Sequence, residues 1–326
     1  MTRPRRALPR PMPRWSLPAT LLVLLGLAAW INEPIPGVTG REARAVAALP
    51  VAPAFRAGQR VLLLSPHPDD ETLCCAGMLT QARAAGAQVF VTWITAGDGF
   101  EFDAALTERT LHPQGRALRA LGERRVGEAR PAAVVLGIPL DHQVVLGYPD
   151  GGLRFLNGVN FDRPYTSPRT GASATYLREA QTPGAPFTGE ALEADLTRVL
   201  RRVQPDVILI PAHEDFHPDH HTLTLFAQRV AARLGLQDRL CYWVVHGGLE
   251  WPLPKGLHEG LHEGLPLVPP PLARDLPWQR VPLSEQDQAV KLRAVNAYGT
   301  QTEVLGRFMR AFVRRNELLS PVDVPR

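Results

Sequence analysis

The stretch VLLLSPHPDDE, residues 61–71, decides the fold class of this chain. Val61–Leu64 is a continuous apolar run, which is typical of a strand buried on both faces of a sheet. A turn with one histidine and two adjacent aspartates follows at once, and the residues from Thr72 to Ala85 have a helical pattern. A buried strand, a polar turn and a helix in this order predict a β-α unit of a parallel sheet.

The same alternation of strand and helix continues along the chain. Further strands are predicted at 89–94, 144–146, 207–210 and 240–245, and helices at 124–136, 189–203 and 221–234. Repeated β-α-β units predict an α/β, Rossmann-like fold, with a mostly parallel sheet and helices on both faces, in a single domain. Such sheets place their active site just beyond the carboxyl ends of the strands.

Three stretches depart from this alternation. Asn157–Pro186 is rich in Gly, Pro, Ser, Thr and Tyr and is predicted to be a long functional loop, with Tyr165 and Tyr176 as candidates for substrate choice. Trp251–Pro282 contains eight prolines and is predicted to be an irregular surface excursion. Glu303–Leu319 carries apolar residues on one side and is predicted to be a packing helix.

The composition is that of a folded protein of one or two domains. Hydrophobic residues make up 45% of the 326 residues, which is enough for a sizeable core and excludes a mostly disordered chain. The chain has one long apolar run, which excludes a multi-span transporter. Its three cysteines are too few for a disulfide framework.

The formal net charge of +4 comes from the first fourteen residues. These residues contain no acidic side chain and five arginines: Arg3, Arg5, Arg6, Arg10 and Arg14. Without them, 31 basic residues stand against 32 acidic residues, a net charge of −1. The excess is therefore a signal for membrane topology, and no nucleic-acid partner is expected.

An apolar run, Leu17–Ile31, follows these arginines, which is the layout of a signal sequence. The run is shorter than the ~20 residues that span a bilayer comfortably. The first small-x-small triplets lie well beyond it, at 43–47, so we favour a retained signal-anchor over a cleaved signal peptide. The basic flank and the proline-rich stretch that follows argue against a buried helix of a soluble protein.

The expected organisation has three parts. The basic flank and signal-anchor or signal peptide occupy 1–31, a Pro-rich tether 32–56, and the α/β domain 57–320. A retained anchor makes the protein a single-pass protein of the cell membrane with its domain outside the cytoplasm. Cleavage of the segment would make the protein secreted instead.

Chemistry-bearing residues follow two of the predicted strands. The VLLL strand leads into His67, Asp69 and Asp70, and a helix cap would explain one of these aspartates but not the whole set. The VILI strand leads into HEDFHPDHH, residues 213–221, which has four histidines in nine residues. So dense a cluster at a matching strand end is poorly explained as polar surface histidines. The two motifs are expected to meet at one edge of the sheet.

Two histidines and one carboxylate, with a fourth position open to water, are the ligand set of a catalytic zinc site. The two motifs supply that set and leave Asp69 free as a general base and His217 as a general acid. Histidine and carboxylate ligands also suit other divalent metals, so Zn²⁺ is the favoured cofactor and another divalent cation stays an alternative.

The HPDD motif at 67–70 and the HPDH motif at 217–220 resemble those of the PIG-L/LmbE family of zinc-dependent N-acetylglucosaminyl de-N-acetylases. The resemblance runs from about Val61 to Gln301. It implies an LmbE-like deacetylase domain that removes the acetyl group from an N-acetylglucosamine-type amino sugar, in a glycan or a glycolipid. The zinc ligands that it implies are His67, Asp70 and His220.

The same resemblance implies the other roles in the reaction. Asp69 is the general base that takes a proton from the zinc-bound water. His217 stabilises the tetrahedral intermediate and protonates the leaving amine, and Asp219 orients His217. Arg125, in an Arg-x-x-Glu helix, is implied to reach the substrate, and Asp150, in an LGYPDG turn, to lie near the sugar.

Two further details concern the same family. Lys291, Tyr298 and Gln301 resemble its late Lys…Tyr-x-Ser-Gln segment, in which Thr300 here replaces the serine. Some members have a tyrosine two residues before the first histidine of the HPDH motif. This chain has Asp215 there, so a role for such a tyrosine does not carry over.

Other potential sites are set aside. His258–His262 matches H-E-x-x-H, but it lies in a glycine-rich tandem repeat that is a poor helix, so we expect no metal there. Cys74 and Cys75 lie on an apolar helix, and since adjacent cysteines rarely bridge, both are predicted to be small buried hydrophobes, as is Cys241. For His246, at the end of a strand, a structural role and a substrate contact are equally compatible with the sequence.

Two alternatives to a deacetylase stay open at this point. The first is a non-catalytic carbohydrate-binding protein on the same fold, although a binding module has no need of both Asp69 and His217. The second is a metal hydrolase of another amide or ester, because the motifs define the reacting centre and not the sugar.

Overall fold

A computed structural model describes residues 16–99, 114–248, 251–256 and 263–321. Its centre is a seven-stranded sheet in the order β3-β2-β1-β4-β5-β7-β6. The strands are β1 (Arg60–Ser65), β2 (Gln88–Thr95), β3 (Gln143–Tyr148), β4 (Val207–Pro211), β5 (Leu240–Trp243), β6 (Gln279–Pro282) and β7 (Asn316–Pro321). Strands β1 to β5 are parallel, and β7 and β6 extend the sheet in antiparallel pairing. The predicted α/β fold with a mostly parallel sheet is confirmed.

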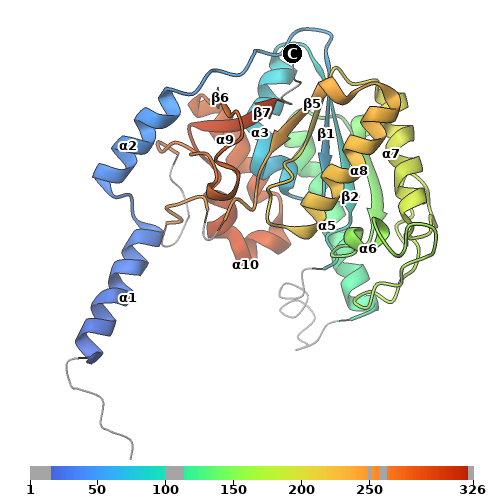
Figure 1. The fold of residues 1–326 in the computed structure, drawn as a ribbon, viewed down its shortest axis with the longest axis horizontal. Coiled ribbons are helices and arrows are strands. Elements are labelled where there is room, and N and C mark those ends of the chain that lie inside the picture. The colour runs from blue at the N-terminus through green and yellow to red at the C-terminus, as the bar shows by residue number, and fades with distance from the viewer. Residues whose placement is uncertain (1–15, 100–113, 249–250, 257–262, 322–326) are drawn as a thin grey trace, which may run out of the picture.

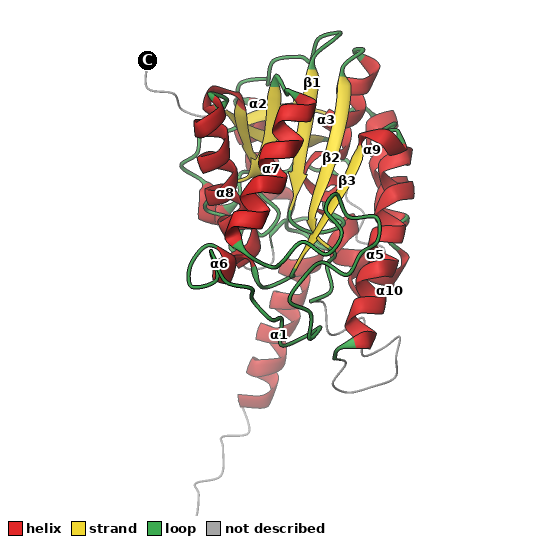
Figure 2. Ribbon diagram, turned by 90° about the vertical axis from the view of Figure 1, so that its right-hand side faces the viewer, coloured by secondary structure: helices red, strands yellow, loops and turns green. Residues whose placement is uncertain are grey.

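Helices cover both faces of this sheet, as Figure 2 shows. One face packs against α3 (Asp70–Ala84), α5 (Arg116–Val135) and α9 (Glu285–Asn296), with α10 (Gly299–Arg310) beside them. The other face packs against α6 (Leu153–Leu156), α7 (Gly189–Val203) and α8 (Pro218–Leu234). Short 3-10 turns lie at Leu140–His142, Gln237–Arg239 and Pro271–Ala273.

Strand β1 shows why the run VLLL is apolar throughout. Val61 and Leu63 belong to the core under α3, whereas Leu62 and Leu64 belong to the core under α7 and α8. All four side chains have 0% exposure. A strand at the centre of a two-faced sheet must be apolar at every position, and it brings the turn after Ser65 to the middle of the sheet edge.

The N-terminal segment stands apart from the sheet as two helices, α1 (Ser16–Asn32) and α2 (Pro36–Ala47) (Figure 1). Within the described part of the chain, one helical segment, Ala19–Ala47, is long and apolar enough to cross a membrane, and a signal sequence would pass the same test. Helix α2 lies where the sequence predicts a tether without periodicity. After α2 the chain joins the sheet edge, where Val51 pairs with Arg280 of β6.

The C-terminal region differs from the sequence prediction. The helix predicted at Glu303–Leu319 is confirmed only as far as Arg310, where α10 ends, and is wrong beyond it, because the residues from Asn316 form β7. The apolar residues at 318 and 319 are adjacent and both buried, which suits a strand covered on two faces rather than one side of a helix. The described residues of Trp251–Pro282 are mostly irregular, as predicted, but Trp251 and Trp278 are buried, and the segment ends in β6.

The cysteines also differ from the prediction. A disulfide joins Cys74 to Cys75 in α3, so these residues are not two separate thiols, although both are buried as expected. Cys241 is free and partly buried.

Candidate active site and metal centre

The two sequence motifs meet at the carboxyl ends of β1 and β4, which are neighbours in the sheet. The HPDD turn joins β1 to α3, and the HPDH loop precedes α8. A pocket of about 490 Å³ opens at this edge. Residues from the sequence analysis that line it are His67, Asp69, Asp70, Arg125, Asp150, His217, His246 and Gln301. The sheet-edge location predicted for the site is where the pocket lies.

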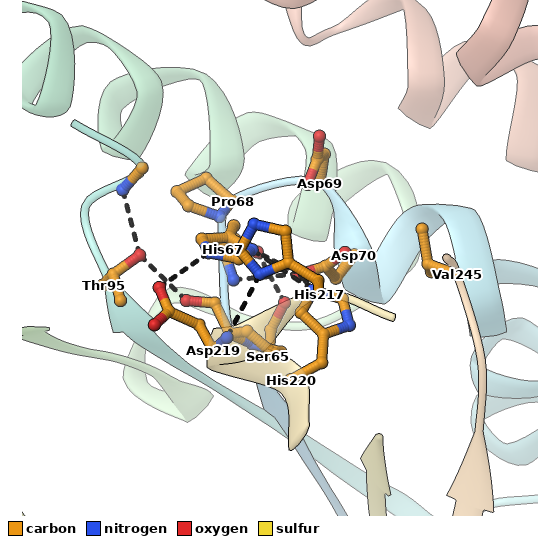
Figure 3. A network of polar contacts seen from close by, with 12 residues as sticks. Ser65, His67, Pro68, Asp69, Asp70, Thr95, His217, Asp219, His220 and Val245 are labelled. Carbon is orange, nitrogen blue, oxygen red and sulfur yellow. Dashed lines mark hydrogen bonds and ion pairs between the residues drawn. The ribbon is translucent and has the colours of Figure 1, made fainter. Parts of the chain in front are cut away.

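Three side chains bring their donor atoms into one small triangle (Figure 3). Asp70 Oδ2 lies 3.2 Å from His67 Nδ1 and 3.1 Å from His220 Nε2. The two ring nitrogens are 3.3 Å apart. Ligand atoms about 2.0–2.1 Å from a tetrahedral zinc ion are themselves separated by about 3.3 Å. The three residues therefore fit a tetrahedral metal ion with one position left for water or substrate.

The charges around this triangle favour a cation. Burial lowers the pKa of His220, but the carboxylates of Asp215 and Asp70 outweigh it and raise that pKa to about 9. Burial likewise opposes charge on His67, and Asp150, Asp219 and Asp70 raise its pKa well above the usual value. The site thus holds positive charge, which protons supply in the metal-free protein and a bound cation would replace.

Carboxylates also stand behind both histidines, on the side away from the triangle. His67 Nε2 lies 3.3 Å from Asp219 Oδ2 and 3.4 Å from Asp150 Oδ1. His220 Nδ1 lies 3.2 Å from Asp215 Oδ2, although the ring is not aligned for a hydrogen bond. Carboxylates in this position orient a metal-bound imidazole and favour the tautomer that ligates.

Asp215 is a residue to which the sequence analysis gave no role. It is 3% exposed, and its carboxylate accepts hydrogen bonds from the backbone N–H groups of His217, Val245 and His246 at 2.9–3.0 Å. Burial opposes ionisation, but these donors and His220 hold the pKa of Asp215 below its usual range. The sequence shows that Asp215 lies two residues before His217, but it does not show the contact of Asp215 with the residues that follow β5.

Asp219, which was expected to orient His217, contacts that ring through its backbone and not through its carboxylate. The Asp219 N–H donates to His217 Nδ1 at 3.2 Å, which leaves the proton of a neutral His217 on Nε2. The Asp219 carboxylate instead accepts from Gly151 N at 2.6 Å and Leu153 N at 3.2 Å, and faces His67. It therefore ties the LGYPDG turn to the HPDH loop.

Asp69 sits at the N-cap position of α3, but its side chain does not cap the helix. Its φ of 131° is a conformation that residues with a side chain rarely adopt, and such strain is concentrated at functional sites. Figure 3 shows Asp70 among the histidines and Asp69 on a separate side of the turn. Burial, followed by the charge of Asp70, raises the pKa of Asp69 to about 7, against the opposing effect of Arg125. A divalent cation nearby would lower this pKa.

Arg125 and Asp150, expected to contact the substrate, line the pocket and also brace it. The Arg125 guanidinium donates to the carbonyl oxygens of Gly97 at 2.5 Å and Pro68 at 3.0 Å, and lies 3.7 Å from Asp69. Asp150 accepts from Gly99 N at 2.9 Å. Both side chains thus stabilise the shape of the pocket wall whether or not a substrate is bound.

The late segment that resembles the family contacts the first motif directly. Gln301 donates to Asp69, and the hydroxyl of Tyr298 donates to Glu71, a carboxylate with 0% exposure. Lys291 donates at 2.7 Å to the carbonyl of Leu73 in α3. Glu71 had no predicted role. It follows the motif in sequence, and its contact with Tyr298 joins the turn to the connection between α9 and α10.

The remaining candidates fall in different places. His246, which the sequence left open, lines the pocket, with its ring centroid 4.9 Å from that of His220. Tyr176, proposed for substrate choice, donates to the buried Asp98 at 2.8 Å and supports the wall, while Arg169 from the same loop lines the pocket. The H-E-x-x-H match at 258–262 lies outside the described residues.

Comparison with known proteins agrees with these motifs. Residues 62–231 match the PIG-L family, described as GlcNAc-PI de-N-acetylase. A 1D-myo-inositol 2-acetamido-2-deoxy-alpha-D-glucopyranoside deacetylase of Saccharopolyspora erythraea is 30% identical over 284 residues, covering 81% of this chain and 86% of the relative. A protein of the same name from Kribbella flavida is 28% identical over 207 residues, 60% of each chain. This chain matches about half to three-fifths of the length of several such relatives.

A solved structure shares the fold. The crystal structure of a deacetylase triple mutant from the teicoplanin biosynthetic pathway superposes with a TM-score of 0.50 at 18% identity. The superposition covers 81% of this chain and 97% of the other. The family match covers more than half of the chain and includes both motifs that build the pocket. The chain therefore belongs to the PIG-L family.

Proposed function

We propose that this protein is a metal-dependent hydrolase that removes the N-acetyl group from an N-acetylglucosamine-type amino sugar. The observation that supports it most is the triangle formed by His67, Asp70 and His220, which fits Zn²⁺, beside an Asp69 whose carboxylate does not cap its helix. The relatives in Saccharopolyspora and Kribbella are named for deacetylation of a glucosamine-type sugar on inositol. The metal is Zn²⁺ or another divalent cation that accepts histidine and carboxylate ligands.

A cation bound there would polarise the acetyl carbonyl and make a water molecule acidic near neutral pH. Asp69 accepts the proton of the attacking water, since its raised pKa lets it hold that proton transiently. His217, with its Nδ1 occupied by the Asp219 N–H, presents Nε2–H to the developing oxyanion. When the C–N bond breaks, His217 donates its Nε2 proton to the leaving amine, the proton that Asp69 took from water restores that nitrogen, and acetate is the other product.

We further propose the location of the domain. The arginines before residue 15, followed by the apolar α1, support a signal-anchor at 1–31 and a domain at 57–320 outside the cytoplasm, joined by residues 32–56. Only α2 interrupts the irregular backbone described between α1 and β1. The protein would then be a single-pass protein of the cell membrane, or secreted if the signal is cleaved.

The test uses the full chain in detergent micelles. Bound metal is measured first, and acetate release is then measured from N-acetylglucosamine attached to inositol, to a second sugar and to a lipid. Acetate release that depends on metal supports the proposal. A metal-loaded protein that binds these sugars and releases no acetate would favour a carbohydrate-binding role, and turnover confined to other amides would favour a different hydrolase.

A further inference from the structure

The last turn of α1 is held against the α/β domain close to the pocket. The carbonyl of Ile31 accepts a hydrogen bond from Lys255 N at 2.6 Å, and the side chain of Asn32 accepts one from Arg307. Asn32 and Lys255 are 7% and 4% exposed, so this contact is buried. The apolar residues of α1 before it are largely exposed, including Leu22 at 69%. The helix therefore leaves the domain at a defined point.

Helix α10 joins that point to the pocket. Gln301 and Leu305 of α10 line the pocket, and Arg307, half a turn further on, binds Asn32 of α1. Figures 1 and 2 both show α1 projecting away from the end of the domain at which α6 and α10 lie. This is also the end at which β1 and β4 finish and the two motifs meet. A bilayer crossed by α1 would therefore face the mouth of the pocket.

Exposed apolar side chains occur at this same end. The two most exposed large apolar residues in the described part of the chain are Val159, at 79%, and Phe216, at 78%. Val159 lies in the loop after α6, and Phe216 directly precedes His217 of the HPDH motif. Single exposed apolar residues are common on proteins, but Phe216 is the sequence neighbour of a pocket-lining histidine, and Val159 follows α6, which lies at the end of the domain from which α1 projects.

The charge of the neighbouring loop suits an anionic surface. Residues 151–170 carry Arg154, Arg163 and Arg169 against one acidic residue, Asp162. Arg154 and Arg169 line the pocket, and the side chain of Arg163 is 82% exposed. Arginines close to a membrane surface are attracted by anionic headgroups.

We propose that the active-site end of the domain docks on the surface of the bilayer that α1 spans. Phe216 and Val159 enter the interfacial layer, and the arginines of 151–170 contact anionic headgroups. The pocket then receives amino sugars that are presented at the bilayer surface. The docked orientation depends on the proposed membrane anchor and is independent of the proposed deacetylation, whereas the delivery of amino sugars to the pocket rests on both proposals.

The first experiment measures docking without enzyme activity. The full chain is reconstituted in vesicles, and an environment-sensitive fluorophore is attached to Val159→Cys, Phe216→Cys or Leu140→Cys. Leu140 is the matched control, because it is 61% exposed and precedes β3, at the opposite end of the sheet. The unsubstituted protein is labelled in the same way, and its signal, which comes from the free Cys241, is subtracted.

A quencher attached to the lipid headgroups should quench the labels at 159 and 216 several-fold more strongly than the label at 140, and more strongly still in vesicles with anionic lipid. Equal quenching at the three positions would overturn the proposal. So would removal of the protein from the vesicles by alkaline carbonate, because α1 would then not span the bilayer.

A second measurement separates docking from the reaction. Val159→Asp should lower acetate release from a lipid-linked acetylated amino sugar in vesicles several-fold and leave release from a soluble conjugate unchanged, whereas Leu140→Asp should change neither. An equal loss on both substrates with Val159→Asp would contradict docking. If no acetylated sugar is a substrate, the proposed function fails, while strong quenching at 159 and 216 would still support the docked orientation.

Discussion

The side-chain amide of Gln301 donates a hydrogen bond to the carboxylate of Asp69, across 232 positions of the chain. Burial and the neighbouring Asp70 favour the protonated form of Asp69, whereas a donated hydrogen bond favours the ionised form. Gln301 lies in the first turn of α10. The position and the proton affinity of the proposed base therefore depend on a helix from the far end of the sequence.

Replacing Gln301 with leucine should raise the pKa of Asp69, because the ionised carboxylate loses a donor. The acidic limb of the pH–rate profile should therefore shift to higher pH by about one unit, which is the size expected for the loss of one charge-assisted hydrogen bond. The exposed Gln237 is a matched control, and Gln237→Leu should leave the limb in place. A pH profile that is unchanged in Gln301→Leu would show that the contact does not tune the base.

Replacing Asp69 with asparagine should lower kcat by about 10²–10⁴-fold, which is the usual contribution of a general base. Metal content should stay the same, because the residues whose geometry fits a metal ion are His67, Asp70 and His220, and Asp69 is not among them. Acetate release and metal analysis on the same preparation are the measurements. Asp141→Asn, at an exposed position, is the control. Near-normal turnover in the metal-loaded Asp69→Asn protein would remove Asp69 from the mechanism.

Replacing Asp215 with asparagine should weaken metal binding by about 10–100-fold, as is typical when a carboxylate behind a ligand histidine is lost. The physical reason is its place 3.2 Å behind His220 Nδ1. Glu214→Gln removes a charge from the adjacent exposed residue and should leave the affinity unchanged. Competition with a chromophoric chelator gives both affinities. Equal effects of the two substitutions would indicate general electrostatics rather than orientation of His220.

Metal binding should release protons. The carboxylates raise the pKa of His220 to about 9, so this ring is protonated at pH 7 without metal, and they also raise the pKa of His67. Because a ligand nitrogen must be unprotonated, binding at pH 7 should release at least one proton, and affinity should rise with pH up to about 9. Calorimetry in buffers of different ionisation enthalpy measures the release. A binding enthalpy that does not vary with the buffer would contradict this.

Replacing Lys291 with methionine should destabilise the fold by about 3–5 kcal/mol, because the charge of its ion-pair partner would stay buried without a counter-charge. Lys291 and Glu317 both have 0% exposure and are 2.7 Å apart, and Glu317 also accepts the N–H groups of Gly77 and Met78. Denaturant unfolding gives the change in free energy. The exposed Arg293→Gln should be neutral. Adding Glu317→Gln to Lys291→Met should recover part of the lost free energy of unfolding. If the second substitution instead lowered that free energy by as much again, the two side chains would not act as a pair.

The sheet and the place of the site were predictable because their signals are local. Val61–Leu64 is apolar at every position because it is the central strand, and the polar turn after it must then lie at the sheet edge. The helix Gly189–Val203 was predicted with its observed bounds, since its apolar residues recur at a helical period.

What the sequence did not reveal depends on contacts between distant segments. Residues 303–319 have an apolar pattern that suits a long helix, and only pairing with β5 and β6 makes the second part a strand. In the sequence, Asp215 and Glu71 look like ordinary acidic residues. Their importance depends on distant partners: Asp215 accepts a hydrogen bond from Val245, just after β5, and Glu71 accepts one from Tyr298. Asp219 was expected to orient His217, and the sequence did not show that its carboxylate would instead accept hydrogen bonds from Gly151 and Leu153.

The hydrogen bonds between α3 and β7 affect when, during synthesis of the chain, the active site can form. Gly77 and Met78 belong to the helix that starts at the metal-ligand candidate Asp70. Their N–H groups donate hydrogen bonds to the carboxylate of Glu317 in β7. The first motif to be synthesised is therefore completed by a strand that lies 240 positions later in the chain. A chain in which β7 has not yet been made would contain both motifs and still have an unfinished site, so the presence of the motifs alone would not make it active.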